Sequence, residues 1–139
     1  MDISYVPNIS IEDYKMLRRS AHFDINSDQR IEAALRNSLY KVAVTHDDKV
    51  IAMARVIGDG GCVYFISDVI VHPDYQGKGI GKRLINHMLD WIDSQVLEGE
   101  TIMVNLMSAY DKEPFYEKLG FSRRPFGKHG CGMSKWIRK

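Results

Sequence analysis

The sequence predicts a single α+β domain, residues 1–139, built on a mixed but mostly antiparallel twisted sheet flanked by helices. Three observations carry this prediction. Runs rich in β-branched residues follow one another between residues 41 and 71 with only turns between them, which indicates an antiparallel meander. A strongly amphipathic helical pattern begins near residue 80. No repeat, linker or low-complexity tract divides the 139 residues.

The first half of the chain supplies most of the sheet. Ser10, with Asp13 three residues later, resembles a capping box at a helix start, and Asp47-Asp48 marks a hairpin turn. The expected elements are a strand at 3–6, a helix from residue 11, a helix from about 28 to 39, and strands at 41–46, 49–56 and 62–71. Residues 21–26 mix an imidazole, an aromatic ring and a carboxylate without periodicity, so we expect a loop that could cover a site.

The second half begins with the amphipathic helix. Its apolar positions recur at helical spacing at Ile80, Leu84, Met88 and Trp91-Ile92. We expect a strand at 101–107, then a short helix bracketed by Pro114 and Gly120, and finally a strand from Met133 to Ile137. An apolar end strand allows edge pairing, so a homodimer is one expectation for the assembly.

The composition excludes several classes of protein. Nineteen basic against eighteen acidic side chains give a net charge of +1, so no overall field attracts nucleic acid or an anionic membrane, and neither partner is expected. No apolar stretch approaches the roughly 18 residues that span a bilayer, and residues 1–4 lack signal-peptide character, so we expect a cytoplasmic protein. Cys62 and Cys131 form no Cys-x-x-Cys pair, and no metal site is predicted.

The chemistry is expected between residues 68 and 83, where a buried strand, a turn and a glycine-rich loop run into the amphipathic helix. The first amides of a helix lack intrahelical acceptors, and the helix dipole is positive there. Glycines allow the backbone to approach a phosphate closely. Lys78, Lys82 and Arg83 add positive charge. This segment therefore predicts an anion-binding site.

Three phosphate-binding motifs compete for this segment. A Walker A loop fails, because Gly77 to Gly81 is one residue short and Arg83 stands where a hydroxyl is needed. A dinucleotide fingerprint is disfavoured, because the third glycine comes one residue early and the preceding strands are antiparallel. The third motif is Gln76-x-x-Gly79-x-Gly81. With it, the sequence resembles the GNAT superfamily of acetyl-CoA-dependent N-acetyltransferases.

Further motifs strengthen the resemblance over residues 62–121. The run Asp68-Val-Ile-Val-His-Pro73 resembles the family's fourth strand, and Asn105 falls in what resembles its fifth. Phe115-Tyr-Glu-Lys-Leu-Gly-Phe121 resembles its second signature, a short helix with a Phe-Tyr pair. The resemblance implies a GNAT-like fold whose fourth and fifth strands splay apart around the pantetheine arm of acetyl-CoA. The alternative, glycines that merely turn a strand into a helix, explains none of these additional motifs.

The resemblance also implies residue roles. Backbone groups of Val69 and Val71 would hold the pantetheine, and amides from Gln76 through Lys82 would hold the pyrophosphate. The full set of implied cofactor-binding residues is Val69, Ile70, Val71, Gln76, Gly77, Lys78, Gly79, Ile80, Gly81, Lys82 and Asn105. Tyr116 matches the family's tyrosine and is expected to act as the general acid that assists thiolate departure. The opposing interpretation makes Tyr116 a packing aromatic like Phe115.

The general base is less clearly marked. Asp68 is the leading candidate, and Glu113, His22 and His129 are weaker ones for which surface roles are expected. Cys131 raises a covalent acyl-enzyme route, but a nucleophilic cysteine needs a base and an electropositive setting. Lys128 and His129 are near it in sequence only, so direct transfer is preferred.

The sequence thus predicts an acyltransferase that moves the acetyl group of acetyl-CoA to a primary amine of a small molecule or peptide. A non-catalytic acyl-CoA-binding or regulatory module and a nucleotide-phosphate binder are the rival hypotheses. The acceptor is open. The basic segment 123–130 suits an acceptor with a negative group, whereas His22, Phe23 and Asp24 suit a cationic amine.

Overall fold

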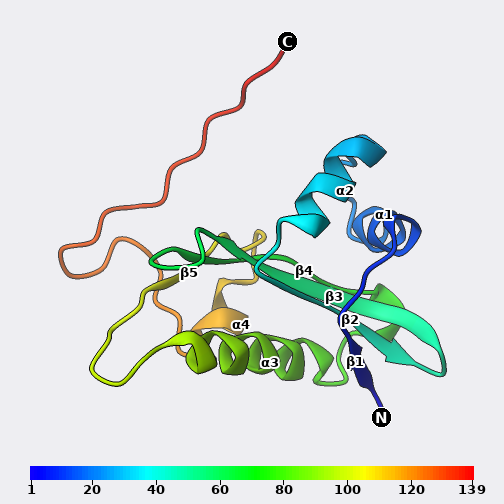
Figure 1. Ribbon diagram of the computed structural model, residues 1–139, viewed down its shortest axis with the longest axis horizontal. Coiled ribbons are helices and arrows are strands. Elements are labelled where there is room, and N and C mark those ends of the chain that lie inside the picture. Colours follow the sequence, from blue (N-terminus) through cyan, green and yellow to red (C-terminus); the bar gives the residue numbers. More distant parts are fainter. The chain divides into compact units, whose positions relative to one another are not determined.

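A five-stranded sheet in the order β1-β2-β3-β4-β5 organises residues Met1–Leu106 of the computed structural model, which describes all residues 1–139 (Figure 1). The strands are β1 (Ser4–Val6), β2 (Tyr40–His46), β3 (Lys49–Gly58), β4 (Tyr64–Val71) and β5 (Val104–Leu106). Neighbours pair antiparallel except β4 and β5, which are parallel. The predicted α+β class with a mixed, mostly antiparallel sheet is confirmed.

The meander is joined by the turns that its sequence requires. Asp47 and Asp48 join β2 to β3 with φ values of 48° and 61°. Two consecutive positive φ angles match the right-handed twist of a hairpin, and aspartate tolerates them better than most residues. The predicted Asp47-Asp48 hairpin turn is therefore confirmed.

Helices cover both faces of the sheet in residues Met1–Leu106. The helices α1 (Ile11–Ser20) and α2 (Asp28–Arg36) lie over one face, and α3 (Ile80–Gln95) lies over the other (Figure 1). Leu17 of α1 and Ile31 of α2 pack in one cluster with Met53 and Ile70 of the sheet. The buried face of α3 consists of Ile80, Leu84, Ile85, Met88 and Ile92. This face matches the predicted apolar stripe.

Polar caps fix the helix starts. The Ser10 hydroxyl accepts a hydrogen bond from the Asp13 amide at 3.0 Å, as the capping pattern predicts. Ser27 caps α2 in the same way. This helix ends at Arg36, earlier than the predicted residue 39. The reason is that the Leu39 amide already donates to the Val56 carbonyl of β3, at 2.8 Å, so the chain has joined the sheet by then.

Residues Met107–Lys139 form a separate compact unit. It contains α4 (Glu113–Glu117) and an isolated bridge between Phe126 and His129. The predicted strand from Met133 to Ile137 is wrong, because these residues form no ladder. A strand is stable only when its amides and carbonyls find partners. Instead, the side chains of Met133, Trp136 and Ile137 are 93%, 71% and 81% exposed.

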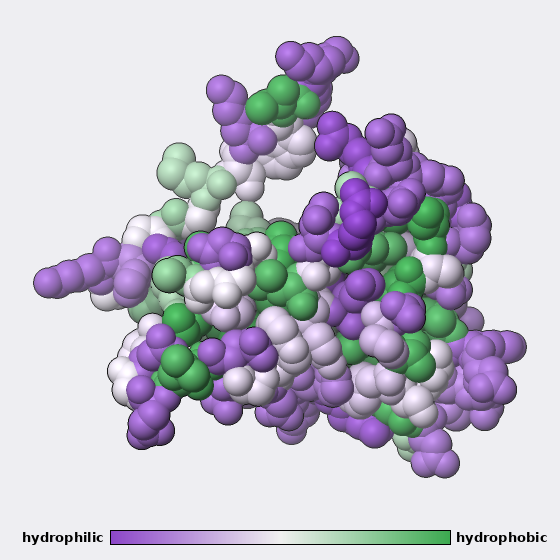
Figure 2. Space-filling view, in the orientation of Figure 1, coloured by the Kyte–Doolittle hydropathy of each residue, from purple (hydrophilic) through white to green (hydrophobic).

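The surface and the helix lengths add two observations. On the face shown in Figure 2, hydrophilic residues surround smaller hydrophobic areas. None of the helices combines the length and the apolar character that crossing a membrane requires.

Candidate active site

The edge of β4 that should face β5 is free over its last residues. Pairing with β5 runs only from Tyr64 opposite Val104 to Ile66 opposite Leu106, whereas β4 continues to Val71. The His72 amide donates to the Ile51 carbonyl of β3 at 2.8 Å. Because backbone groups alternate in direction along a strand, those of Val69 and Val71 face away from β3. They lie where the sequence predicted backbone partners for an extended ligand.

Ile70 differs from its neighbours. Its side chain is 3% exposed and belongs to the core beneath α1 and α2, and it pairs with Met53 in the β3–β4 register. The structure therefore does not bring Ile70 to the free edge with Val69 and Val71. Asn105 is half-buried on β5, opposite Phe65.

The glycine-rich loop presents bare backbone. Gly77 and Gly79 have φ values of 75° and 78°, and an added Cβ at either position would meet no atom within 4 Å. Gly79 is the N-cap of α3 and offers no side-chain cap. The first amides of α3, those of Ile80, Gly81 and Lys82, consequently have no intrahelical acceptor. Backbone that is open to solvent, with free amides and a helix dipole, is suited to a phosphate.

Four side chains in and beside this loop differ in their surroundings. Lys78 and Lys82 are exposed, whereas the Ile80 side chain is buried in the core, so Ile80 can contribute only its amide. The Gln76 side-chain amide donates to the Val71 carbonyl at 2.9 Å. Gln76 thus connects the loop to the free edge of β4.

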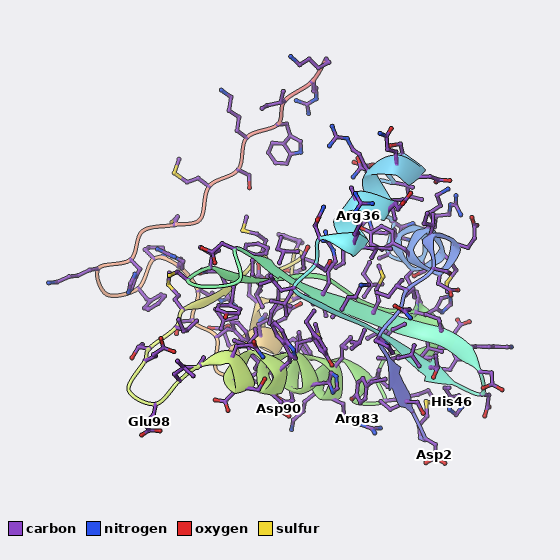
Figure 3. All side chains as sticks on the ribbon, in the orientation of Figure 1. Asp2, Arg36, His46, Arg83, Asp90 and Glu98 are labelled. Carbon is purple, nitrogen blue, oxygen red and sulfur yellow. The ribbon has the colours of Figure 1, made fainter.

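Arg83 is directed elsewhere. Its guanidinium donates to the Met1 carbonyl at 3.1 Å, so it extends from α3 toward the beginning of β1 (Figure 3). The positive charge beside the loop therefore comes from the two lysines.

Asp68 occupies a bulge in β4. Arg55 of β3 pairs with Ser67 and Met53 pairs with Ile70, so Asp68 and Val69 together stand opposite Ala54. Asp68 has a φ of 53°, in the left-handed region. Such a bulge bends its strand. Only Ser67 separates it from Ile66, the last residue of β4 that pairs with β5.

The Asp68 carboxylate is enclosed by donors. It accepts from the Tyr14 hydroxyl at 2.8 Å, from Arg18 Nη1 at 3.0 Å and from Arg55 Nε at 2.6 Å, and its side chain is only 5% exposed. Sequence reasoning identified Asp68 as the leading base, but both of its carboxylate oxygens already accept hydrogen bonds from protein donors, and its side chain is closed off from an incoming amine. The structure therefore favours a structural role for it.

Tyr14, Arg18 and Arg55 were not predicted as site residues. Burial, and then the Asp68 charge, raise the pKa of Tyr14 to about 12, so its hydroxyl remains a donor at neutral pH. Their only signal in the sequence is that each stands at a position where the local pattern favours an apolar residue. The partners lie up to 54 residues apart along the chain, so no local motif joins them.

In the second unit, Tyr116 lies on α4 between two aromatic rings. Its ring makes edge contacts with Phe115 and Phe121, with centroids 5.1 Å and 5.9 Å away. Burial raises the pKa of Tyr116 above its ordinary value of 10. The phenol is therefore protonated at neutral pH, as a general acid requires.

Two of the weaker candidates, His22 and His129, are exposed, and Glu113 is half-buried. His22 is exposed after α1, Glu113 begins α4, and His129 takes part in the bridge to Phe126. Cys131 is an exposed free thiol whose Sγ lies 3.8 Å from the Arg124 carbonyl. No cluster of His, Cys, Asp or Glu is arranged to hold a metal ion.

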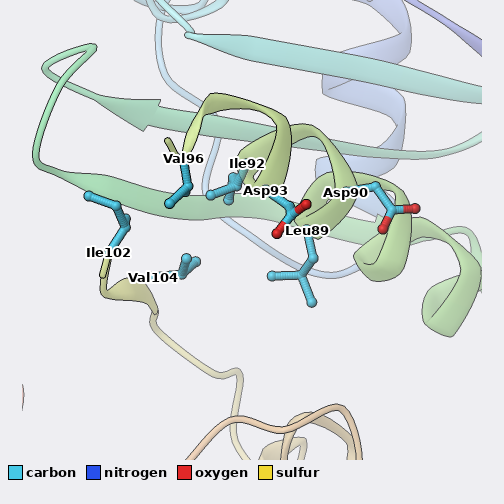
Figure 4. A pocket seen from close by; sticks show the side chains of 7 residues that line it. All are labelled: Leu89, Asp90, Ile92, Asp93, Val96, Ile102 and Val104. Carbon is cyan, nitrogen blue, oxygen red and sulfur yellow. The ribbon is translucent and has the colours of Figure 1, made fainter. Parts of the chain in front are cut away.

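A groove of about 430 Å³ lies at the other end of α3 (Figure 4). Its lining residues are Leu89, Asp90, Ile92, Asp93, Val96, Ile102 and Val104. Ile92 is twelve residues beyond Ile80, or roughly 18 Å along a helix axis. This groove is therefore distinct from the glycine-rich loop.

Comparison with known proteins gives consistent matches. Residues 37–123 match the acetyltransferase (GNAT) domain family. An uncharacterized N-acetyltransferase of Pyropia yezoensis, ycf52, is 30% identical over 127 residues, which cover 88% of this chain and 71% of the relative. A ycf52-like protein of Prochlorococcus marinus is 33% identical, over 89% of this chain and 69% of its own length.

Solved structures agree. A Staphylococcus aureus protein of unknown function, described as a probable acetyltransferase, matches with a TM-score of 0.82 and 30% identity over 96% of this chain and all of its own. A GNAT-family acetyltransferase of Streptococcus pneumoniae gives 0.79 and 27%, over 99% and 98%. N-acetylglutamate synthase of Neisseria gonorrhoeae, complexed with coenzyme A and N-acetyl-glutamate, gives 0.68 and 20%, over 85% and 28%, and shows the fold alone.

Proposed function

Because the chain belongs to the GNAT family of acetyltransferases, we propose that it transfers an acetyl group from acetyl-CoA to a primary amine of a small molecule or peptide by direct attack. One observation carries this proposal. The free edge of β4 leads within a few residues to bare backbone at the start of α3, beside the exposed Lys78 and Lys82. An extended amide-bearing arm that ends in a pyrophosphate requires such a pair of neighbouring sites.

The residues present fit acetyl-CoA. The backbone groups of Val69 and Val71 hold the pantetheine in this proposal, and the amides from Gln76 through Lys82 hold the pyrophosphate. The open space around Gly77 and Gly79 admits a phosphate that a Cβ would obstruct. Asn105, on the facing strand, offers a further amide to the same arm.

Bound acetyl-CoA would supply a thioester whose carbonyl carbon is open to attack by an amine. Burial raises the pKa of Tyr116 above its ordinary value of 10, so its hydroxyl keeps its proton at neutral pH. In this proposal that hydroxyl donates a hydrogen bond to the departing sulfur and so stabilises the developing thiolate. The Asp68 carboxylate is held by Arg18 and Arg55. In this proposal the amine therefore loses its proton to solvent water rather than to Asp68.

The deciding experiment has two stages. Calorimetry with acetyl-CoA measures binding, and release of free CoA thiol is then followed with a panel of polyamines, amino sugars, amino acids and peptides. Turnover on at least one amine supports the proposal. Binding without turnover on any amine supports the acyl-CoA-binding module, and competition by ATP for the free protein supports the nucleotide-phosphate binder.

The direct route is tested separately. Intact-protein mass spectrometry after incubation with acetyl-CoA alone is expected to detect no acetyl adduct. A stoichiometric adduct on Cys131 with ping-pong kinetics would replace direct transfer by an acyl-enzyme. The proposal includes a single catalytic domain over residues 1–139 and a cytoplasmic location. The homodimer that the sequence suggested relied on an apolar end strand, and residues 133–137 form no strand. Sedimentation measures whether the chain is a monomer or a homodimer.

A further inference from the structure

We propose that Arg18 is a positioning residue that fastens the connection between α1 and α2 to the bulge of β4, and thereby sets the wall on the acceptor side of the active site. This inference rests on the proposed function, because it takes the reactive end of acetyl-CoA to lie beside Val69. The connection comprises residues 21–26 and is called the acceptor loop below. All the groups involved lie in the unit Met1–Leu106.

One guanidinium makes both attachments. Arg18 Nη1 donates to Asp68 Oδ1 at 3.0 Å. On its other side, Nε and Nη2 donate to the Asp24 carbonyl at 3.0 Å and 2.6 Å. The guanidinium carbon also lies 5.0 Å from the centroid of the Phe23 ring. The planar group therefore bridges the carboxylate of the bulge and the backbone of the acceptor loop.

The bulge end of this bridge is rigid. The Asp68 carboxylate is also held by Tyr14 and by Arg55, and the Arg55 guanidinium reaches the Ala34 carbonyl at the end of α2, at 3.4 Å. The Arg18 side chain is 22% exposed, compared with 14% for Arg55 and 5% for Asp68. Arg18 is thus the outermost part of a buried cluster and the part that contacts the acceptor loop.

The acceptor loop is anchored near its two ends, because Ala21 and Ile25 pack against the core beneath α1 and α2. The residues between them have fewer restraints. Phe23 is 40% exposed, and His22 has a φ of 60°. Backbone hydrogen bonds join the loop to the end of α1. The His22 amide donates to the Arg19 carbonyl, and the Phe23 amide donates to the Arg18 carbonyl. The two hydrogen bonds from Arg18 to Asp24 hold the middle of this loop.

Geometry places this loop at the reactive end of the proposed site. Asp68 directly precedes Val69, whose backbone faces the free edge of β4. Only the Arg18 guanidinium therefore stands between the Asp24 carbonyl and the Asp68 carboxylate of the bulge, next to Val69. The phosphate end is defined by α3, which begins at Ile80. An amine that reaches the acetyl group approaches the bulge, so the loop attached there shapes its path.

A lysine cannot replace this bridge. A guanidinium offers donors in a fixed planar fork, whereas an ammonium is a compact point charge that can satisfy one acceptor group well. Arg18→Lys is expected to keep the pair with Asp68 and to lose the attachment of the acceptor loop. Arg18→Met removes both attachments while keeping an apolar stem of similar length. Arg19→Met, on the neighbouring exposed arginine, is the matched control.

Hydrogen exchange of the free protein tests the bridge without any ligand. In Arg18→Met and Arg18→Lys, we expect amides of residues 21–26 to exchange about tenfold or more faster than in wild type, because charge-assisted hydrogen bonds are lost. Arg19→Met should leave them unchanged. Phe23→Leu removes only the exposed ring, so it keeps the fold and should speed exchange by a smaller factor. Unchanged exchange in both the Arg18 and the Phe23 variants would overturn the bridge.

Kinetics tests the consequence. With the best amine of the panel, both Arg18 variants should lower kcat/KM for the amine by about 10- to 100-fold, because small misplacements are costly. Calorimetry should show acetyl-CoA affinity within about twofold of wild type, since α3 is untouched. Equal losses of acetyl-CoA and amine binding would assign Arg18 a general structural role. If wild type itself binds no acetyl-CoA, the proposed function fails, while the exchange result still decides the bridge.

Discussion

The glycine-rich loop and the Asp68 cluster lie at the two ends of the same short segment, but they are built in opposite ways. The loop is exposed, its Gly77 and Gly79 have open space around them, and α3 begins there without a side-chain cap. The cluster is buried, and the Asp68 carboxylate is enclosed by three donors. One region offers unsatisfied backbone, whereas the other has satisfied its polar groups.

This difference separates binding from positioning. Free amides at a helix start can bind an anion because no protein group accepts their hydrogen bonds. A carboxylate paired with two guanidinium groups has little capacity left, but it fixes the backbone on which it sits. Substitutions in the loop should therefore abolish ligand binding, and substitutions in the cluster should cost stability first.

Gly79→Val should have the largest effect, an acetyl-CoA affinity below detection in calorimetry. The side chain would stand in the open space over the free amides, and valine resists the φ of 78°. Gly99→Val is the matched control, because Gly99 also has a positive φ of 85° and open space, on the connection that follows α3. Both variants should lose about 1–2 kcal/mol of stability. Normal binding by Gly79→Val would move the phosphate site elsewhere.

Asp68→Asn should lower the free energy of unfolding by about 3 kcal/mol, because it leaves the partly buried Arg18 and Arg55 without their counter-charge. Asp111→Asn is the control, since Asp111 is an exposed aspartate with a similar φ of 65°. It should be nearly neutral. Denaturant titration measures both. A stable Asp68→Asn protein with its turnover abolished would restore Asp68 as the general base.

The sequence was sufficient for the regions that local pattern determines. Gln76, Gly79 and Gly81 lie close together in the sequence, between residues 76 and 81. The apolar residues from Ile80 to Ile92 recur about once every helical turn. The buried face of α3 follows directly from that spacing. The phosphate-binding prediction rests on the same short segment, so it needed no knowledge of distant contacts.

The cluster could not be predicted because it depends on register. Tyr14 and Arg18 are one helical turn apart, but only the packing of α1 on β4 brings them to Asp68. The bulge that gives Asp68 its positive φ is a local shift between β3 and β4, and no residue pattern marks it. The strand expected from Met133 to Ile137 failed for a related reason, because apolar side chains do not specify a pairing partner.

Tyr116→Phe tests a residue that lies in neither region. It should leave acetyl-CoA affinity unchanged and lower kcat by roughly 10²-fold, because only the proton donor is removed. Tyr110→Phe, at a tyrosine that is 89% exposed in the same unit, should have no effect. Because burial raises the pKa of Tyr116, wild type should keep its rate as the pH rises to 10 and lose it only above. Unchanged kcat would leave Tyr116 with a packing role.

His87 is half-buried, so its burial is intermediate between that of the exposed loop and that of the buried cluster. Its substitution should have the smallest effect. It lies on α3 with its ring stacked on Tyr5 at 3.9 Å between centroids, and Nε2 is 2.8 Å from the Tyr40 hydroxyl. Burial lowers the pKa of His87 below 6.5, so the unfolded chain takes up its proton more readily than the folded one. The resulting stability is present above pH 6.5 and is lost as the pH falls toward the lowered folded value.

His87→Gln should therefore flatten this part of the pH dependence while leaving stability at pH 7.5 only slightly reduced. Melting temperatures at pH 7.5 and 5.5 measure it, with His129→Gln, on an exposed histidine, as control. A half-buried group with one polar partner has neither the free amides of the loop nor the ion pairs of the cluster. Equal pH dependence in His87→Gln and wild type would show that the ring is hydrated when folded, so that stacking alone does not exclude water from it.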